Sequence, residues 1–416
     1  MQLRSALLHG VRQLATTPTE RRLAAATLVQ LIRSRQHLLR LTQPLLALLA
    51  DRGGPKLHLW GGIAGLLATR PVAMQQPQLA AFRQALATTA AYANAQQQLV
   101  MSLSSPYSRG FAYGQLLSQW QAQPPERLLV FHHYDRRGVL PRSWLQALLS
   151  IQQAGWQVVF STSYLLPSQA ELLRQAGVLL ALRQNVGRCL GAYRDLTLLL
   201  LHDPRLARHV RSLVLCNDST LPLAGDHSLI SQLQAWAEAG EAISRPRLAG
   251  LTDSAERGLY HLQSYLLHAN AALIQHPAWL RFWLEFSPSA SKDHLIDAGE
   301  IGLSQALLAA SVELQPAYGL VAGVLEDAAM AEELQSYGLS RPDQVNPSLF
   351  AWQSLLGRGS PLVKKHVLFA LLENQGQLMP LASLARWIPI DRSALIAADL
   401  HELFVSRYLG PPSQRS

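Results

Sequence analysis

Asn217, Asp218 and Ser219 are the polar residues best placed for chemistry, because they directly follow a short apolar run, residues 213–216. Such a run is typical of a buried β-strand, and its polar end is typical of a turn. In an open α/β sheet, ligands bind at the carboxyl ends of the strands. Asp218 and Asn217 therefore indicate a binding site at a strand end. The alternative interpretation is that Asp218 only caps a strand-to-helix turn.

A glycine-containing loop precedes this strand in the chain. It spans residues 183–193, RQNVGRCLGAY, and its fixed points are Asn185, Gly187 and Gly191. Glycine lets a backbone come close to a phosphate or ribose, and it also permits the positive φ of an ordinary turn. Both interpretations stay open for this loop.

Other polar side chains follow or interrupt apolar runs. His133 and Asp135 follow residues 127–132, and Asp253 follows residues 248–252. Strand-end positions favour ligand contact, whereas an isolated residue in a loop is more often a surface or turn residue.

Two further groups lie later in the chain. His261, Gln263 and Ser264 alternate with apolar neighbours, so one face of this segment is polar and lines either a groove or solvent. Asp293, Asp297 and Glu300 precede or begin a helical pattern, where acids at a helix start also stabilise the macrodipole.

The elements that must position these residues alternate in type between residues 124 and 345. The predicted strands are 127–132, 156–161, 178–183, 213–216, 248–252, 262–267 and 313–317, and the predicted helices are 141–154, 167–177, 226–240 and 299–310. This alternation implies parallel strands joined by right-handed crossovers. We therefore expect an α/β fold with a mostly parallel sheet flanked by helices.

Helical patterns flank the predicted α/β domain on both sides. We expect an added N-terminal helical region over residues 1–123 and a C-terminal helical segment over residues 346–416. The C-terminal segment is predicted to contain a helix at 361–373, two short helices after it, and a disordered tail at 410–416.

Composition limits the class of protein. Hydrophobic residues make up 49% of the 416 residues and charged residues 15%, which predicts a large buried core. Cys189 and Cys216 are the only cysteines, and neither has metal-type spacing, so we expect no disulfide and a reducing cytoplasm. No signal-peptide pattern begins the sequence, and no apolar run is long enough to span a bilayer. The expectation is a soluble or peripheral protein.

Positive charge is concentrated near the N-terminus. The net charge is +9, and residues 1–60 hold nine Lys and Arg against two acids on a helical apolar pattern. A basic amphipathic helix is typical of contact with anionic lipid or a partner. The alternative is a helical cap packed on the main domain. Nucleic acid is disfavoured as a partner because aromatic and glycine residues do not interleave with the charge.

With its motifs in this order, the chain resembles the rhamnan synthesis protein F family over roughly residues 128–368. Members of that family are rhamnosyltransferase-like enzymes that build cell-surface polysaccharide and lipopolysaccharide side chains. The landmarks are FHHYDRRG at 131–138, RQNVGRCLGAY at 183–193, LVLCNDS at 213–219, GLTDS at 250–254, YHLQSYLL at 260–267, SKDHLIDAGEIGLSQAL at 291–307 and NPSLFAWQSLLGRGSPLVKK at 346–365.

The resemblance implies a glycosyltransferase A-type, Rossmann-like fold. It also implies inverting transfer of a rhamnose-like deoxysugar from a dTDP- or UDP-linked donor to a growing glycan or lipid-linked glycan. The reaction would take place in the cytoplasm or on the inner face of the cytoplasmic membrane.

The resemblance also implies roles for single residues. Asp218, helped by Asn217, would hold Mg²⁺ or Mn²⁺ on the donor diphosphate, and basic side chains replace the metal in some enzymes of this fold. The base that accepts the acceptor's proton would be Glu300 or Asp293, with Asp297 a further candidate. The other implied contacts are His133, Asp135, Asn185 and Gly187 for the donor and His261, Gln263 and Ser264 for the acceptor. Asp253 is a third candidate catalytic residue, which could contact the donor sugar or the acceptor.

Two departures from the family pattern favour a second interpretation, a catalytically degenerate relative that binds a glycan or a protein partner. Arg188, Cys189 and Leu190 stand where the family usually carries an aromatic-Asp-aromatic triplet. Residues 220–223, TLPL, stand where a Gly-Pro turn is usual.

Overall fold

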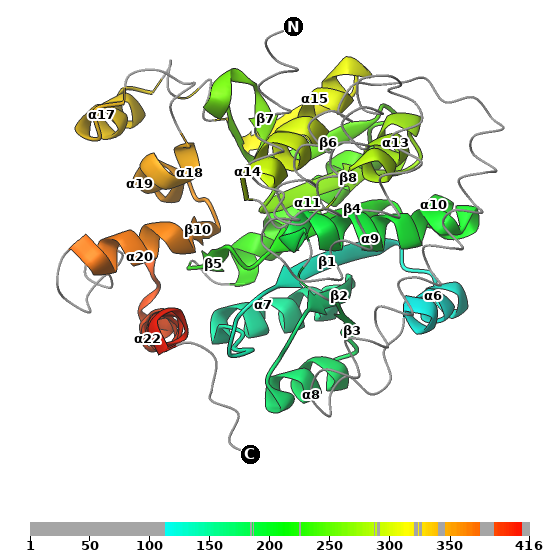
Figure 1. Ribbon diagram of the computed structural model, residues 1–416, viewed down its shortest axis with the longest axis horizontal. Helices are drawn as coiled ribbons and strands as arrows, with labels where there is room; N and C mark the ends of the chain where they lie inside the picture. Colours follow the sequence, from blue (N-terminus) through cyan, green and yellow to red (C-terminus); the bar gives the residue numbers. More distant parts are fainter. Residues whose placement is uncertain are drawn as a thin grey trace, which may run out of the picture.

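The computed structural model of the chain describes residues 113–183, 185, 187–223, 226–286, 288, 292–319, 323, 327–339, 346–374 and 387–409. These residues form a mixed α/β fold in which a mostly parallel central sheet is flanked by helices (Figure 1). The predicted fold class is confirmed at that level. The basic segment 1–60 and the tail 410–416 lie outside the described residues.

The sheet has eight strands in the order β3-β2-β1-β4-β8-β6-β7, and β9 pairs with β6. Their bounds are β1 Arg127–His133, β2 Gln157–Thr162, β3 Leu179–Leu182, β4 Ser212–Asn217, β6 Arg247–Ser254, β7 His261–Leu262, β8 Leu266–Asn270 and β9 Glu313–Tyr318. Strands β1 to β4 are mutually parallel, and β9 is parallel to β6. Strand β8 runs antiparallel between β4 and β6.

One predicted strand, residues 262–267, is wrong. The structure divides it into β7, which pairs with the end of β6, and β8, which pairs with both β4 and β6. The apolar alternation continues across both pieces, so the pattern itself hides the break. Between the two strands, the N–H of Ser264 donates to Glu300, and the carbonyl of Tyr265 accepts the N–H of Asn217.

Helices cover both faces of the sheet because successive residues of a strand point to opposite sides. In β1, Leu129 and Phe131 pack with one core cluster, and Leu128 and Val130 pack with the other. The first cluster includes residues of α7 (Arg142–Gln153), α8 (Pro167–Gln175) and α11 (Asp226–Glu241). The second includes residues of α6 (Tyr113–Ala122), α9 (Arg188–His202), α10 (Pro204–His209), α12 (Ala271–Ile274), α13 (Pro277–Glu285) and α15 (Gly302–Ala309).

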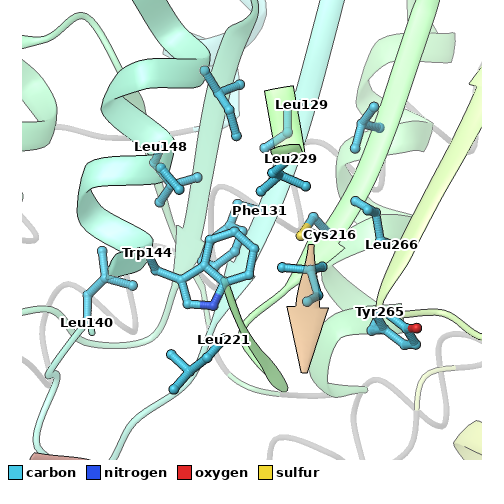
Figure 2. Packing of buried hydrophobic residues seen from close by; sticks show 14 of the residues in the cluster. Leu129, Phe131, Leu140, Trp144, Leu148, Cys216, Leu221, Leu229, Tyr265 and Leu266 are labelled. Atoms are coloured by element: carbon cyan, nitrogen blue, oxygen red, sulfur yellow. The ribbon is translucent and has the colours of Figure 1, made fainter. Parts of the chain in front are cut away.

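Figure 2 shows the first cluster at the point where the C-terminal part of the chain joins it. Trp144 of α7 packs against Phe131 with ring centroids 4.6 Å apart. Its indole N–H donates to the carbonyl of Thr220 at 2.6 Å, so this buried polar group is satisfied. Leu221, beside Trp144 in the same view, belongs to the short strand β5 (Thr220–Pro222).

Strand β5 pairs antiparallel with β10 (Leu362–Lys364), which corrects the predicted helix at 361–373. A helix does follow, α20 (Lys365–Asn374), but it begins only after the strand. Val363 suits a strand because Val is β-branched, and Pro361 precedes the strand, where its missing N–H removes no ladder hydrogen bond. Because β5 follows β4 in the chain, the pairing brings β10 next to the carboxyl end of β4.

The remaining elements complete the described fold. They are the 3-10 turn η2 (Glu256–Gly258), α14 (Lys292–His294), the π-helical segment η3 (Leu295–Ile301), α17 (Ala328–Ser336), α18 (Pro347–Phe350), α19 (Trp352–Gly357), the 3-10 turn η6 (Ile390–Arg392) and α22 (Ser393–Leu409). The predicted helix 299–310 therefore begins earlier, at Lys292. Of the two short helices predicted near the C-terminus, the described residues show one helix, α22, which is 17 residues long, and residues 375–386 lie outside the described part of the chain.

Helix α22 is joined to the α/β domain by a buried carboxylate. Asp399 accepts hydrogen bonds from the backbone N–H groups of Arg142 at 2.6 Å and Ser143 at 2.9 Å. These are among the free donors of the first turn of α7, which Asp399 thus caps from a distant part of the chain. None of the helices in the described ranges is long and apolar enough to cross a bilayer.

Candidate active site

The carboxyl ends of β1 and β4 meet the start of β8 at one edge of the sheet. The N–H of Asp218 donates to the carbonyl of His132 at 3.0 Å, and the N–H of Asn217 donates to the carbonyl of Tyr265 at 3.2 Å. Because all three strand ends are fixed to one another by backbone hydrogen bonds, the side chains that leave this edge have a rigid support.

Asp218 forms an ion pair with Lys365. The Lys365 Nζ lies 3.0 Å from the Asp218 Oδ2, and the N–H of Lys365 donates to the carbonyl of Ser219 at 2.8 Å. Burial alone would raise the pKa of Asp218, but the charge and hydrogen bond of Lys365 outweigh it and hold that pKa below its usual value. The carboxylate is therefore ionised and already neutralised by a lysine.

The last two residues of β1, the neighbour of β4 in the sheet, are the buried histidines His132 and His133. One ring nitrogen of His132 lies 3.2 Å from Asn185 Oδ1 and the other 3.4 Å from Ser161 Oγ. His133 lies between Thr162 Oγ1 at 3.1 Å and the carbonyl of Val139 at 3.0 Å. Burial lowers the pKa of both, for His132 to about 3, so these rings are neutral supports.

His133 and Asp135, both predicted to bind the donor, form hydrogen bonds to the backbone of the loop that follows β1. His133 is fully buried. Asp135 accepts the N–H groups of Arg137 at 2.8 Å and Val139 at 3.1 Å through one carboxylate oxygen, as an Asx turn does. Both residues shape the loop after β1, and donor contact by either stays a prediction.

Gly187 sits where only glycine fits. Its φ is +73°, and a Cβ built there would lie 2.4 Å from the Cβ of Pro288 and 3.0 Å from the Cα of Gly191. Asn185, just before it, is held by His132. The predicted importance of backbone shape in this loop is thus supported by a positive φ and a close approach of two segments.

Cys189 lies in the first turn of α9 and is a free, half-buried cysteine. Burial first, and then the nearby charge of Glu300, raise the pKa of Cys189 to about 12, and Asp218 acts in the same direction. The thiol therefore stays protonated and is a poor nucleophile. Asn217, the residue before Asp218, donates from its amide to the carbonyl of Ser264 at 3.4 Å, and the N–H of Ser264 binds Glu300, so Asp218 and Glu300 are linked through Ser264.

Glu300, a predicted base, is held in place by Ser264 and faces His261. Its Oε2 accepts the N–H of Ser264 at 2.7 Å and the Oγ–H of Ser264 at 2.5 Å. Its Oε1 faces the Nε2 of His261 at 3.7 Å, and the two side chains are 15% and 1% exposed. Because the Nδ1 of His261 lies 2.8 Å from the carbonyl of Leu259, Nδ1 is the donor and Nε2 points at Glu300.

The backbone around Glu300 is π-helical over Leu295–Ile301, a conformation that is frequent at functional sites. Gly299 lets this segment approach α9 closely, because a Cβ there would lie 2.4 Å from the Cδ1 of Leu190. The sequence predicted an acidic helix start, but only the packed π-helical segment explains why Glu300 faces inward beside Cys189.

The other acids of this helix face elsewhere. Arg257 binds Asp293 at 2.9 Å and Asp297 at 2.5 Å, and the Asp293 side chain is 81% exposed.

Asp253, in β6, is buried, and burial followed by the charge of this carboxylate raises the pKa of the neighbouring Tyr260. Among the three predicted catalytic acids, the geometry favours Glu300.

Gln263 and Asn217 are engaged inside the protein. Gln263 accepts the Thr252 hydroxyl at 2.8 Å and donates to Asn346 Oδ1 at 2.9 Å. Asn217 donates to the hydroxyl of Tyr193 at 3.0 Å and accepts the N–H of Ser219 at 2.9 Å. The predicted ligand contacts of these two side chains are not tested, but their observed role is to join neighbouring elements.

The prediction missed Lys364 and Lys365. Lys364 ends β10, and its Nζ lies 4.4 Å from the centre of the Tyr265 ring, a cation–π contact. Both lysines stand in the landmark at 346–365, directly after an apolar pair, and that strand-like ending was the available signal.

The residues at this edge do not fit the predicted Mg²⁺ or Mn²⁺. Such ions take several oxygen ligands, including at least one free carboxylate. Asp218 is bound by Lys365, and the amide of Asn217 is used internally. In the part of the chain that the structure describes, no group of three or more His, Cys, Asp or Glu could hold a metal ion.

No protein-family model matches this chain, and no curated protein matches it. Among solved structures it is similar to the mannosyltransferase PcManGT from Pyrobaculum calidifontis, determined in complex with GDP-Man and Mn2+. The match has 12% identity and a TM-score of 0.25, and it covers 78% of this chain and 94% of that chain. No inference is based on so distant a match, and the resemblance to the rhamnan synthesis protein F family stays a prediction.

Proposed function

We propose that this protein is a glycosyltransferase that moves a sugar from a nucleoside-diphosphate donor to a glycan acceptor. The observation that carries the proposal is the placement of the Asp218–Lys365 pair and of Glu300 at the carboxyl edge of a mostly parallel sheet, linked through the Ser264 contacts to Asn217 and Glu300. One side of this edge holds cationic side chains suited to a diphosphate. The other holds a fixed carboxylate suited to accepting a proton.

In the proposed reaction, an acceptor hydroxyl oxygen attacks the anomeric carbon of the donor sugar and forms a new C–O bond. Its proton passes to Glu300, whose orientation is held by Ser264. The bond from the anomeric carbon to the diphosphate breaks, and its electron pair stays on the diphosphate oxygen. A single displacement of this kind inverts the anomeric centre.

The finer assignment rests on the family resemblance of the landmarks. We propose a rhamnose-like deoxysugar on dTDP or UDP as the donor, and a growing cell-surface polysaccharide or lipopolysaccharide glycan, free or lipid-linked, as the acceptor. Work on the inner face of the cytoplasmic membrane would agree with the basic N-terminal segment.

A panel of nucleotide-sugars scored by melting temperature tests the proposal. A ligand that binds only the native state stabilises it by about 2.7 kcal/mol at 100 times its Kd. We expect one nucleoside-diphosphate sugar to raise Tm and, with a glycan acceptor, to release nucleoside diphosphate. If no nucleotide-sugar stabilises the protein, the proposal is wrong.

The second candidate is a degenerate relative that binds a glycan or a protein partner. It is favoured by the absence of an acid in the Arg188-Cys189-Leu190 triplet and by the internal use of Asn217 and Gln263. Glycan binding without any sugar transfer, measured with the stabilising donor present, would support this candidate over the first.

A further inference from the structure

The proposed donor site holds two lysine ammonium groups, Lys364 and Lys365, where a metal site would be expected to present free carboxylates. The carboxylate at the end of β4, Asp218, already faces an ammonium group at 3.0 Å. A divalent cation on Asp218 would have to displace Lys365 or share the carboxylate with it, and two cations at such a distance repel each other.

Lys364 supplies a second positive charge beside the first. Its Nζ contacts the Tyr265 ring, and in the described part of the chain it has no hydrogen bond or ion pair. Burial lowers the pKa of Lys364, while the Glu300 carboxylate acts against that shift. A partly buried ammonium without an anionic partner gains strongly when an anion arrives.

The two lysines are held next to the same group of residues. The Nζ of Lys364 lies over the ring of Tyr265, whose carbonyl accepts the N–H of Asn217, and Asp218, the next residue, binds Lys365. The β5–β10 pairing fixes their backbone, with Lys364 opposite Thr220, two residues after Asp218. The lysines therefore enter the site from a rigid strand and the helix that follows it.

We propose that Lys364 and Lys365 together neutralise the donor diphosphate in place of a divalent metal ion, with Asp218 positioning Lys365. This inference rests on the proposed function, because it specifies how the leaving group is stabilised. The two ammonium groups and the Asp218 carboxylate carry a net charge of +1, the same as one Mg²⁺ or Mn²⁺ bound to that carboxylate. As the glycosidic bond breaks, the electron pair that stays on the diphosphate oxygen lies against these two charges.

The test measures binding of UDP, dTDP and GDP to the full chain by calorimetry, in Mn²⁺ and in excess EDTA. We expect the best of the three to bind with a Kd that differs by less than about 3-fold between the two conditions. Lys364→Gln and Lys365→Gln should each weaken it about 10-fold or more, since each removes a charge-assisted contact to phosphate.

Two comparisons make the result specific. The matching nucleoside, which lacks phosphate, should bind the variants and the native protein equally. Arg205→Gln, which removes an exposed cation on α10 at the opposite edge of the sheet, should leave nucleotide binding unchanged.

The outcomes separate the two proposals. Nucleotide binding that disappears in EDTA and is unaffected by both lysine changes would overturn the metal-free site while leaving the glycosyltransferase proposal in place. Binding of no nucleotide under either condition would overturn both. Should a lysine variant fail to fold, the comparison of Mn²⁺ with EDTA on the native chain still decides the question.

Discussion

The ammonium of Lys365 lies 3.0 Å from the carboxylate of Asp218 although the two residues are 147 positions apart in the chain. The pair joins the end of β4 to the beginning of α20, and the β5–β10 pairing beside it gives the same junction a backbone frame. The described part of the C-terminal segment therefore contributes directly to the candidate site. Its hydrophobic residues, among them Trp352 and Leu362, also belong to the core of the α/β domain.

Removal of Asp218 should destabilise the protein even without ligand. Asp218→Ala leaves the Lys365 ammonium largely buried and unpaired, so we expect a loss of about 1–3 kcal/mol in the free energy of unfolding. The double variant Asp218→Ala, Lys365→Met should be more stable than the sum of the single changes implies. Urea unfolding of the four proteins measures this coupling, and strictly additive losses would contradict the pairing.

The Asp218 contribution should also depend on pH. The pKa of Asp218 is lowered in the folded state, so its stabilisation is complete above the unfolded value of about 3.9 and is lost as pH falls through the folded pKa. The stability difference between native protein and Asp218→Asn should stay constant from pH 7 to 5 and shrink below about pH 4. A difference already lost at pH 5 would contradict the lowered pKa.

Glu300→Gln should reduce catalysis while leaving donor binding intact. The amide oxygen can still accept from Ser264, but the group can no longer take up a proton, so we expect the transfer rate to fall by about 10²-fold or more with nucleotide-sugar affinity within a few-fold. Asp293→Asn is the matched control. Asp293 is exposed and bound by Arg257, so this variant should transfer sugar at the normal rate. The reverse result would move the base to Asp293.

Gly187→Ala should be far more damaging than Gly155→Ala. Both glycines have positive φ, +73° and +88°, but a Cβ at Gly187 would lie 2.4 Å from Pro288, whereas nothing lies within 4 Å of one at Gly155. We expect Gly155→Ala to cost about 1 kcal/mol of stability from backbone strain alone, and Gly187→Ala to cost at least about 2 kcal/mol more. Equal urea midpoints for the two variants would contradict the close packing of this loop.

Acidification should destabilise the protein through its buried histidines. Burial lowers the pKa of His132 and of His268 to about 3, so between pH 6.5 and about 4 the unfolded chain binds more protons than the folded one. As the pH is lowered through this range, the free energy of unfolding should therefore decrease by up to about 1.4 kcal/mol per pH unit for each such histidine. Replacement of His132 by Asn should reduce this slope, and an unchanged slope would show that His132 is not held neutral.

The basic N-terminal segment should bind anionic vesicles. Residues 1–60 carry nine Lys and Arg against two acids, and each such residue near an anionic surface contributes about 1 kcal/mol. A truncated protein should begin at Tyr113, because Leu116 and Trp120 of α6 are buried in the core. We expect the full chain to sediment with phosphatidylserine vesicles and the truncated protein to remain in solution. Equal binding of both would favour a structural cap.

The sequence by itself determined the parallel half of the sheet and the position of its functional edge. Hydrophobic runs of strand length, separated by helical patterns, are local signals, and β1 to β4 formed where these runs predicted them. Because parallel strands place their carboxyl ends together, the strand-end residues His133 and Asp218 were also expected at one edge. Glycine at position 187 was recognisable for the same reason, since its backbone requirement is local.

Only the tertiary structure decided which side chains complete the site. Lys365 reaches Asp218 through a strand pairing between distant segments, and Glu300 gains its orientation from Ser264 and His261 through a π-helical turn. Long-range pairing leaves no periodic signal in either partner, because it depends on the relative placement of elements that are already formed. Local physics therefore predicted where the site lies, and packing between distant segments decided its charge and the choice of Glu300 as the candidate base.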